Sequence, residues 1–411
     1  MRFQFVPSSE LHELFELPWS EPLASWDEAR LVRMARGVSR HVVRFVRAHD
    51  RVFALKETTT ELAEREYSRL RLLALERLPA VEAVGLVTDR SGPDGDLPAV
   101  LVTRYLDYSL PYRYLFSIEP GQGIDRRLID AAVVLLVRLH LDGFYWGDCS
   151  LSNLLFRRDA GALMAYLVDA ETTEHHARLP DGMRESDISL ARENVAGGLF
   201  DLQQRGRLGD DIDVVELADL LEERYRALWD ELTGAEEIPV DERHSIDRRI
   251  RRLNDLGFDV DELVVEHDPA HARLRVQPAL IEEGHHNREL RSLTGLEVQE
   301  NQARRLLNDI AAFGAALARD EGRDVPPAIA AARWLHEVFA PVTALAPDDL
   351  RGRLEPAELF HEFLEHRYYL AETAGHDIDL ETACRSYVDN VLRFRPDERV
   401  LPDDEDADDD A

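Results

Sequence analysis

The order of secondary-structure patterns in the first hundred residues is the feature that most restricts the fold. Residues 30–56 contain three short apolar runs, separated by the turn-like stretches "RGVS" and "RAHD". The last run alternates apolar and other residues and ends at Lys56, so the segment predicts three short strands. A helical stripe follows over 58–78, with threonines that supply an N-cap. Two more strand patterns lie at 82–89 and 99–106. This order predicts a small, mostly antiparallel sheet with one helix inserted.

From residue 125 onward the pattern changes to helix. Residues 125–143 predict a helix that ends at a glycine, and 151–171 predict a hairpin of two strands. Amphipathic helices follow over 185–203 and 213–232. The predicted fold class is α+β, with a strand-rich part followed by a helical part.

A boundary is predicted near residues 233–241, and a mostly helical α+β extension follows it. Its predicted elements are, in order, a helix, two strands and three helices (245–258, 261–268, 272–279, 294–317, 357–375 and 380–394). The predicted organisation begins with an N-terminal segment (1–29) and a first domain (30–234) in two parts, about 30–110 and 111–234. An α+β domain (235–345), a helical segment (346–398) and an acidic disordered tail (399–411) follow.

Charge and apolar content exclude several classes of function. The net charge of −32 argues against nucleic-acid binding, because phosphate neutralisation requires a basic face. No apolar run approaches the ~20 residues that span a bilayer. The first residues lack the pattern of a signal peptide, and two cysteines, Cys149 and Cys384, cannot form a disulfide framework. We therefore expect a cytoplasmic protein without a membrane span.

The distribution of basic residues singles out one position. Of the 49 basic residues, Lys56 is a lysine and the other 48 are arginines. Lysine carries a compact charge on a flexible stem, and the planar guanidinium of arginine cannot replace it at a site that needs such a charge. Chance could also leave one lysine, so its sequence neighbourhood decides the interpretation.

Five residues at strand ends, in loops or on the inserted helix suit phosphoryl transfer, a reaction that needs bound phosphates, neutralised charge and an oriented alcohol. Lys56 would contact the phosphates of ATP, and Glu66 would keep that ammonium charged. Asp148 would orient the attacking hydroxyl. Asn153 and Asp169 would offer oxygen ligands to Mg²⁺, which prefers hard oxygen donors together with phosphates.

Each of these residues also has a plain structural interpretation when it is taken alone. Asp148 and Asp169 are ordinary turn residues, and Asn153 could cap the entry to a strand. Glu66 could be a solvated helix acid, with Glu64 as the rival partner of Lys56. The consistent order of all five favours the functional interpretation.

The same ordered motifs resemble the protein-kinase-like superfamily. They are "FALK", "EREYSRLRLL", "LHLDGFYWGDCSLSNLLF" and "YLVDAE", within roughly residues 30 to 230. The pattern is most similar to the small-molecule branch, the lipopolysaccharide core (Kdo and heptose) kinases and aminoglycoside phosphotransferases. The whole chain also resembles an actinobacterial family of unknown function in which such a module carries a C-terminal extension.

The resemblance implies a two-lobed kinase fold with ATP bound between a strand-rich lobe and a helical lobe. It implies that Asp187 braces the catalytic loop from a helix. It further implies a set of nucleotide-contacting residues in the reduced glycine-rich loop, on the lysine strand and in the adenine-facing hinge (Gly37, Ser39, Lys56, Thr103, Tyr105 and Leu106).

Departures from the family pattern leave the activity open. Trp146 stands where a histidine is usual, Ser150 where protein kinases have a lysine, and Glu171 where the metal motif has a glycine. The first hypothesis is an ATP- and Mg²⁺-dependent phosphotransferase acting on a hydroxyl of a small molecule, such as a sugar or glycolipid precursor. The alternative is an ATP-binding pseudokinase with a protein partner at residues 235–398, and AMP transfer to proteins is a third hypothesis.

Overall fold

The computed structural model describes the whole chain except for a set of short segments and the C-terminal tail (residues 8, 33, 35–39, 50, 119–122, 235, 240–252, 254–259, 269–272, 281–283 and 399–411). The strand predicted before "RGVS" is absent from the described residues there, where Leu31 forms only an isolated bridge with Val46. The predicted helix at 245–258, apart from Leu253, and the acidic tail at 399–411 lie outside the described part. The chain divides into two compact units. The first unit holds Met1–Arg157 and Met164–Arg226, and the second holds Arg158–Leu163 and Ala227–Arg399.

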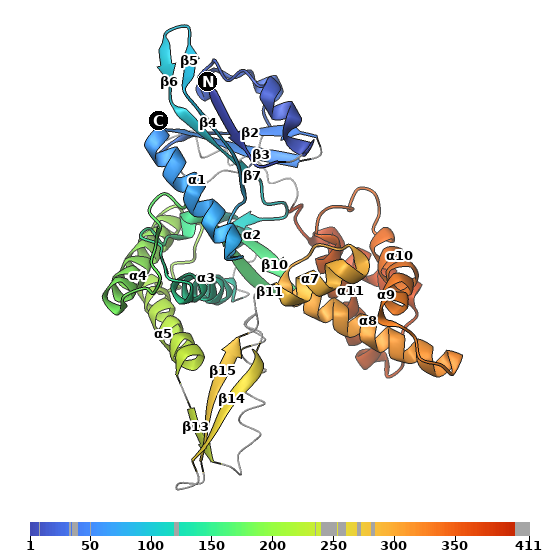
Figure 1. Cartoon of the computed structure of the whole chain (residues 1–411). Coiled ribbons are helices and arrows are strands. Elements are labelled where there is room, and N and C mark those ends of the chain that lie inside the picture. Colours follow the sequence, from blue (N-terminus) through green and yellow to red (C-terminus); the bar gives the residue numbers. More distant parts are fainter. Residues whose placement is uncertain are drawn as a thin grey trace. The chain divides into compact units, whose positions relative to one another are not determined.

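An antiparallel sheet of five strands dominates the beginning of the first unit, and Figure 1 shows it together with helix α1. Its strand order is β1-β4-β7-β3-β2. The strands are β1 (Arg2–Phe5), β2 (Val42–Ala48), β3 (Arg51–Thr58), β4 (Ala83–Thr88) and β7 (Ala99–Arg104). Because β3 lies between β2 and β7, both of its edges are paired, and the side chains it presents are held in a fixed register.

Helix α1 (Thr60–Leu75) connects β3 to β4 and packs one face inward. The Thr59 side chain caps its first turn by accepting a hydrogen bond from the Leu62 backbone N–H. The buried face carries Ala63, Tyr67 and Leu70 at helical spacing, with Glu66 among them. The helix is therefore confirmed. Of its expected apolar stripe, Tyr67, Leu70 and Leu73 are buried, whereas Leu62 is half-buried and Leu75 is exposed.

The remaining elements of the first unit are mostly helical. They comprise a small hairpin, short strands and four helices (β5, Arg90–Gly92; β6, Gly95–Leu97; β8, Leu110–Pro111; α2, Tyr112–Ile118; α3, Ile124–Leu141; β9, Phe144–Tyr145; β10, Leu154–Asp159; β11, Ala162–Leu167; β12, Glu174–His175; α4, Asp181–Gln204; α5, Val214–Thr233). The N-terminal strand β1, the β5–β6 hairpin and the two-residue strands were not predicted, because they are too short to show a period.

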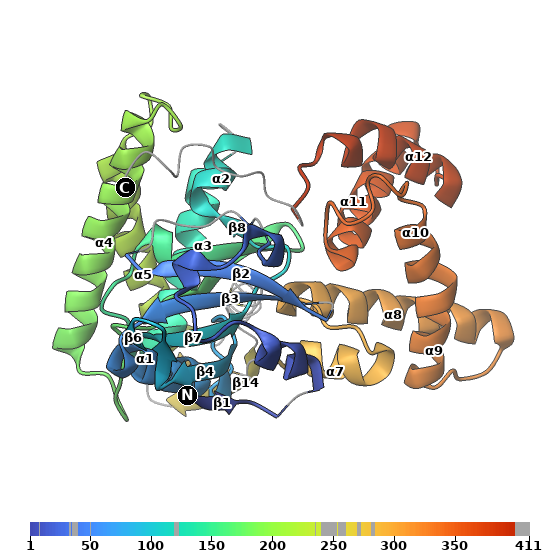
Figure 2. The ribbon, with the colours of Figure 1, turned by 90° about the horizontal axis from the view of Figure 1, so that it is seen from above.

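Helices α4 and α5 run beside each other, as Figure 2 shows. Arg226 of α5 donates to Glu185 of α4 at 2.7 Å, and Arg192 of α4 donates to Asp219 of α5 at 2.6 Å. In the interior, the Tyr225 hydroxyl of α5 lies 2.7 Å from Nδ1 of His140 on α3. These contacts join α3, α4 and α5 into one helical layer.

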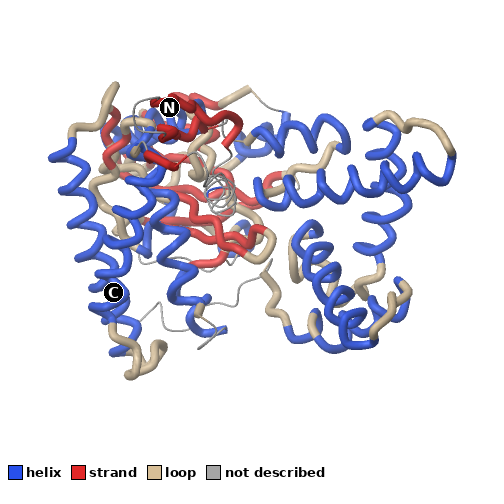
Figure 3. The backbone as a smooth tube through the Cα atoms, turned by 90° about the horizontal axis from the view of Figure 1, so that it is seen from below, coloured by secondary structure: helices blue, strands red, loops and turns tan. Residues whose placement is uncertain are grey.

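The second unit combines a three-stranded antiparallel sheet with a set of helices, and the colours of Figure 3 distinguish the two kinds of element. The strand order is β13-β15-β14. The elements are β13 (Glu236–Pro239), β14 (Val260–Asp268), β15 (Arg273–Leu280), α7 (His285–Thr294), α8 (Glu300–Glu321), α9 (Pro327–Trp334), a π-helical turn (Leu335–Phe339), α10 (Ala340–Ala344), α11 (Pro356–Ala374) and α12 (Leu380–Asn390). Both units mix helices with antiparallel strands, so the α+β class is confirmed.

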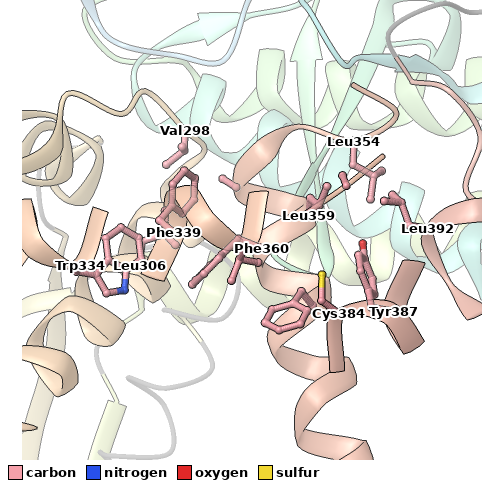
Figure 4. Packing of buried hydrophobic residues seen from close by; sticks show 14 of the residues in the cluster. Val298, Leu306, Trp334, Phe339, Leu354, Leu359, Phe360, Cys384, Tyr387 and Leu392 are labelled. Atoms are coloured by element: carbon pink, nitrogen blue, oxygen red, sulfur yellow. The ribbon is translucent and has the colours of Figure 1, made fainter. Parts of the chain in front are cut away.

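The helices of the second unit enclose an aromatic core, shown in Figure 4. Trp334 and Phe360 meet edge to face with ring centroids 5.5 Å apart, and Phe339 lies 5.2 Å from Phe360. The indole N–H of Trp334 donates to Asp309 at 2.6 Å, which satisfies the one polar atom of that ring. None of the helices in the described ranges has the length and apolar content needed to cross a bilayer.

The tip of the β10–β11 hairpin is part of the second unit. The Asp159 carboxylate is buried and accepts hydrogen bonds from the backbone N–H groups of Gln302, at 2.8 Å, and Asn301, at 3.2 Å. Glu358 accepts the Ala160 N–H at 2.8 Å, and Arg158 donates to Glu398 at 2.6 Å. Asp159 thus accepts from two N–H groups in the first turn of α8, and it shares that of Gln302 with the side chain of the N-cap residue Gln299.

Replacement of Asp159 by alanine should destabilise the second unit by about 1–3 kcal/mol, because the buried Asn301 N–H loses its acceptor and the Gln302 N–H keeps only the Gln299 side chain. Denaturant unfolding followed by circular dichroism measures the loss. Asp320→Ala, an exposed position near the end of the same helix, is the matched control. Equal unfolding midpoints for D159A and D320A would contradict the role given to Asp159.

Stability of the second unit should also depend on pH through the same carboxyl. Burial raises the pKa of Asp159 from 3.8 to about 7, against the two backbone donors that lower it. The folded chain therefore binds this proton more tightly than the unfolded chain does, and stability falls as pH rises through the window from about 4 to about 7. The slope from one group is at most about 1.4 kcal/mol per pH unit. Unfolding titrations across this window should show a shallower fall for D159N than for the wild type.

Candidate functional site

Lys56 projects from the central strand of the first unit. On β3 it pairs with Val43 of β2 on one side and Leu101 of β7 on the other. Its ammonium lies 2.7 Å from Oδ2 of Asp169 and 3.0 Å from Oε2 of Glu66. Only 13% of the Lys56 side chain is exposed, so these ion pairs form largely out of water. Three residues that the sequence analysis assigned to one site therefore meet at one nitrogen.

Glu66 reaches Lys56 from the buried face of α1, whereas its rival Glu64 is exposed. Burial and the neighbouring Asp169 together raise the pKa of Glu66 to about 7, against the lowering effect of Lys56. Burial also lowers the pKa of Lys56, but Glu66 and Asp169 outweigh it, so this pKa lies above 10.5. The ammonium therefore stays charged at neutral pH.

Asp169 lies just after β11, and the next acid, Glu171, turns back to the same ammonium. The backbone N–H of Glu171 donates to Oδ1 of Asp169 at 2.9 Å. Oε2 of Glu171 lies 3.5 Å from the Lys56 ammonium and 3.2 Å from Nε2 of His41. The sequence analysis treated Glu171 only as a departure from a family motif and did not consider His41. The spacing of two residues between the acids was the available signal for Glu171.

The composition of this cluster fits a divalent cation with oxygen ligands. Oxygens of Glu66, Asp169 and Glu171 all lie within 4.8 Å of one another. Three carboxylates against one ammonium leave an excess of two negative charges when all three are ionised. Hard carboxylate oxygens are the donors that Mg²⁺ prefers.

Asp148 lies in the loop between β9 and β10, and its carboxylate accepts hydrogen bonds from two amides. Nδ2 of Asn153 donates to Oδ2 at 3.1 Å, and Nδ2 of Asn194 donates to Oδ1 at 3.3 Å. Asn153 uses its nitrogen for this contact, so its ligand atom Oδ1 is not involved in it. The backbone carbonyl of Asn153 accepts the N–H of Val168 at 3.0 Å, which connects the Asp148 loop to the residue before Asp169.

The backbone of the Asp148 loop is fixed by Asp187 on α4. The fully buried Asp187 carboxylate accepts the N–H of Trp146 at 2.7 Å and that of Gly147 at 2.9 Å. His140 lies 3.0 Å from the same carboxylate. Gly147 has φ +78°, and a Cβ there would lie 2.9 Å from the Tyr145 ring. The tight turn before Asp148 therefore requires glycine.

The predicted hinge residues lie at the end of β7. Thr103 pairs with Ala54, two residues before Lys56 on β3. The Tyr105 N–H donates to Val52 at 2.9 Å, and its ring meets Phe45 edge to face at 5.8 Å. Leu106 follows it, half-buried. Gly37 and Ser39 lie outside the described residues.

Comparison with known proteins gives one family match. A family model, Domain of unknown function (DUF4032), matches residues 227–392, within the second unit. No curated protein matches the chain. Among solved structures, WaaP in complex with acyl carrier protein is similar at 17% identity, with a TM-score of 0.37, over 62% of this chain and 99% of that chain. A score of this size carries no argument, so the chemistry of the site is argued from its own residues.

Replacement of Asp187 by asparagine should destabilise the first unit by about 2–4 kcal/mol, because an amide N–H₂ would face buried donors. Thermal unfolding followed by circular dichroism measures the change. The control is Asp181→Asn, at the exposed start of the same helix. If D187N unfolds at the temperature of D181N, Asp187 does not hold the loop.

Proposed function

We propose that the first unit is a phosphotransferase with a kinase-like, two-lobed arrangement, which uses ATP and Mg²⁺ and transfers the γ-phosphoryl group to a hydroxyl of a small molecule. The observation that carries this proposal is the convergence of Glu66 and Asp169 on the Lys56 ammonium. Separate elements supply the three groups, namely α1, the segment after β11 and β3. Phosphoryl transfer requires this kind of prearranged charge more than it requires covalent catalysis.

Lys56 would bind phosphate oxygens of the nucleotide. Its amine carries a proton at neutral pH, and Glu66 holds it from the side of α1. Asp169 has two carboxylate oxygens, and one of them accepts the Glu171 N–H. Asp169 and the Asn153 Oδ1 would hold Mg²⁺, with Glu171 beside them. When bound, the ion would neutralise negative charge on the phosphate oxygens.

Asp148 would orient the acceptor. In the proposed step, a lone pair of the acceptor hydroxyl forms a bond to the γ-phosphorus, and the bond between that phosphorus and the β,γ-bridging oxygen breaks. ADP leaves with the electron pair of the broken bond, and the hydroxyl proton passes to Asp148 and then to water. The chain's part in this step is to align the attacking oxygen and to accept its proton.

The acceptor class comes from the resemblance and not from the geometry. The small-molecule branch of the superfamily suggests a sugar or a glycolipid precursor. An enzyme that uses ATP needs a compartment that contains it, which fits a cytoplasmic location. The two buried free cysteines, Cys149 and Cys384, fit the same location.

Replacement of Asp148 by alanine should reduce ATP turnover by at least about 10³-fold while changing MgATP affinity less than about threefold, because its role lies in the transition state. Turnover is measured as ADP release with pooled cell metabolites as acceptors, and affinity by calorimetry. Lys56→Met is the comparison variant, and it should weaken affinity itself.

The two alternative functions give different results in the same assays. Wild-type protein that binds MgATP and releases no ADP with any acceptor would overturn the transferase and favour the pseudokinase. Label from α-³²P-ATP retained on protein would favour AMP transfer.

A further inference from the structure

The environment of Asp148 contains a residue to which neither the sequence motif nor the family resemblance gives a role. Asn194 lies on α4 and is half-buried. Its Nδ2 donates to Oδ1 of Asp148 at 3.3 Å, while Asn153 donates to the other oxygen, Oδ2, at 3.1 Å. Each oxygen of the carboxylate therefore has one amide donor. Two donors on different oxygens oppose rotation of the carboxylate plane, which one donor alone would permit.

The position of Asn194 on α4 gives its contact a geometric basis. Asn194 follows Asp187 by seven residues, which is close to two turns of an α-helix, so both side chains lie on the same face. Asp187 holds the backbone of residues 146 and 147, and Asn194 holds the side chain of residue 148. One helix face thus fixes the turn before Asp148 and the direction in which Asp148 points.

The charge of the donors also matters. Asn153 and Asn194 are neutral, so they stabilise the carboxylate without placing a cation beside it. Ser150 occupies the position that a lysine takes in protein kinases, and its hydroxyl lies 2.9 Å from that of Ser152. The loop has a serine where protein kinases have a lysine, and Asn194 donates a hydrogen bond to Asp148 from helix α4.

We propose that Asn194 is a positioning residue, which orients Asp148 toward the acceptor hydroxyl. This inference rests on the proposed phosphotransferase function. The two amides leave a second lone pair on each carboxylate oxygen for the acceptor. A purely structural role would instead use the bond to attach α4 to the loop, and it would affect stability without changing the catalytic step.

The first experiment measures phosphate release from MgATP with water as the acceptor. N194A should lower kcat by about 10- to 100-fold, the effect of one hydrogen bond to a charged group, and should leave the KM for MgATP within about twofold. N194D should lower kcat further. The added carboxylate cannot donate a hydrogen bond to Asp148, and it repels a carboxylate at that position. Glu193→Ala, at the exposed neighbouring position, is the matched control.

These results separate the two proposals. Wild-type protein without phosphate release or transfer to any acceptor overturns the proposed function, and the catalytic role of Asn194 with it. Wild-type turnover with N194A equal to E193A in kcat overturns the role of Asn194 alone. A KM for MgATP that changes in N194A as much as kcat does also overturns it, because a displaced α4 would disturb nucleotide binding and turnover together.

A second measurement does not depend on turnover or on a folded N194A protein. The side-chain amide signals of Asn194 can be assigned in asparagine-labelled protein by their absence from N194D. In D148N these signals should shift, and those of Asn287, an asparagine of the second unit, should not. Unchanged Asn194 signals in D148N would show that the contact is absent in solution and would overturn the proposal.

Discussion

The ion pairs of a single ammonium group hold together the part of the molecule on which the rest of the site depends. Lys56 draws Glu66 from α1 and Asp169 from the end of β11 to one point, with Glu171 half an ångström farther away than Glu66. Each carboxylate alone would be costly to bury, and the ammonium alone would lose its proton. Together they keep the ammonium charged, and the three carboxyl groups around it outnumber the one lysine. The site is therefore stable as folded and still attracts cations and the ligands that bring them.

The sequence predicted this part of the fold well because its determinants are local. The apolar residues of strand β3 and helix α1 recur at the spacing of a strand and of a helix. On the helix, this spacing places Glu66 on the buried face and Glu64 on the exposed face. The pairing of Lys56 with Asp169 spans 113 residues, and no local pattern predicts it. Only the ordered motifs and the family resemblance brought the two residues into one hypothesis. His41 and Asn194 carry no motif, so their contacts appear only in three dimensions.

The second unit shows a different limit of prediction from the sequence. Its family match begins at residue 227, yet the unit includes Arg158–Leu163 from the middle of the preceding domain. A boundary placed by composition divides a chain into consecutive pieces, and it cannot assign a hairpin tip to a distant domain. The physical reason for this assignment is the first turn of α8, whose N–H groups require an acceptor that Asp159 supplies. Without the tip, the Asn301 N–H would lose its acceptor, and the Gln302 N–H would keep only the Gln299 side chain.

The departures from the kinase pattern acquire a physical explanation in the Asp148 loop. Trp146 is fully buried, and its backbone N–H is bound by Asp187, so the loop is held through its main chain and not through a histidine side chain at this position. Ser150 offers no cation, and the donors to Asp148 are the amides of Asn153 and Asn194. In its proposed role, Asp148 needs a fixed direction, and two neutral amides, one in the loop and one on α4, hold its two oxygens. Loss of the usual loop residues therefore does not imply loss of the arrangement, since α4 provides it from another part of the chain.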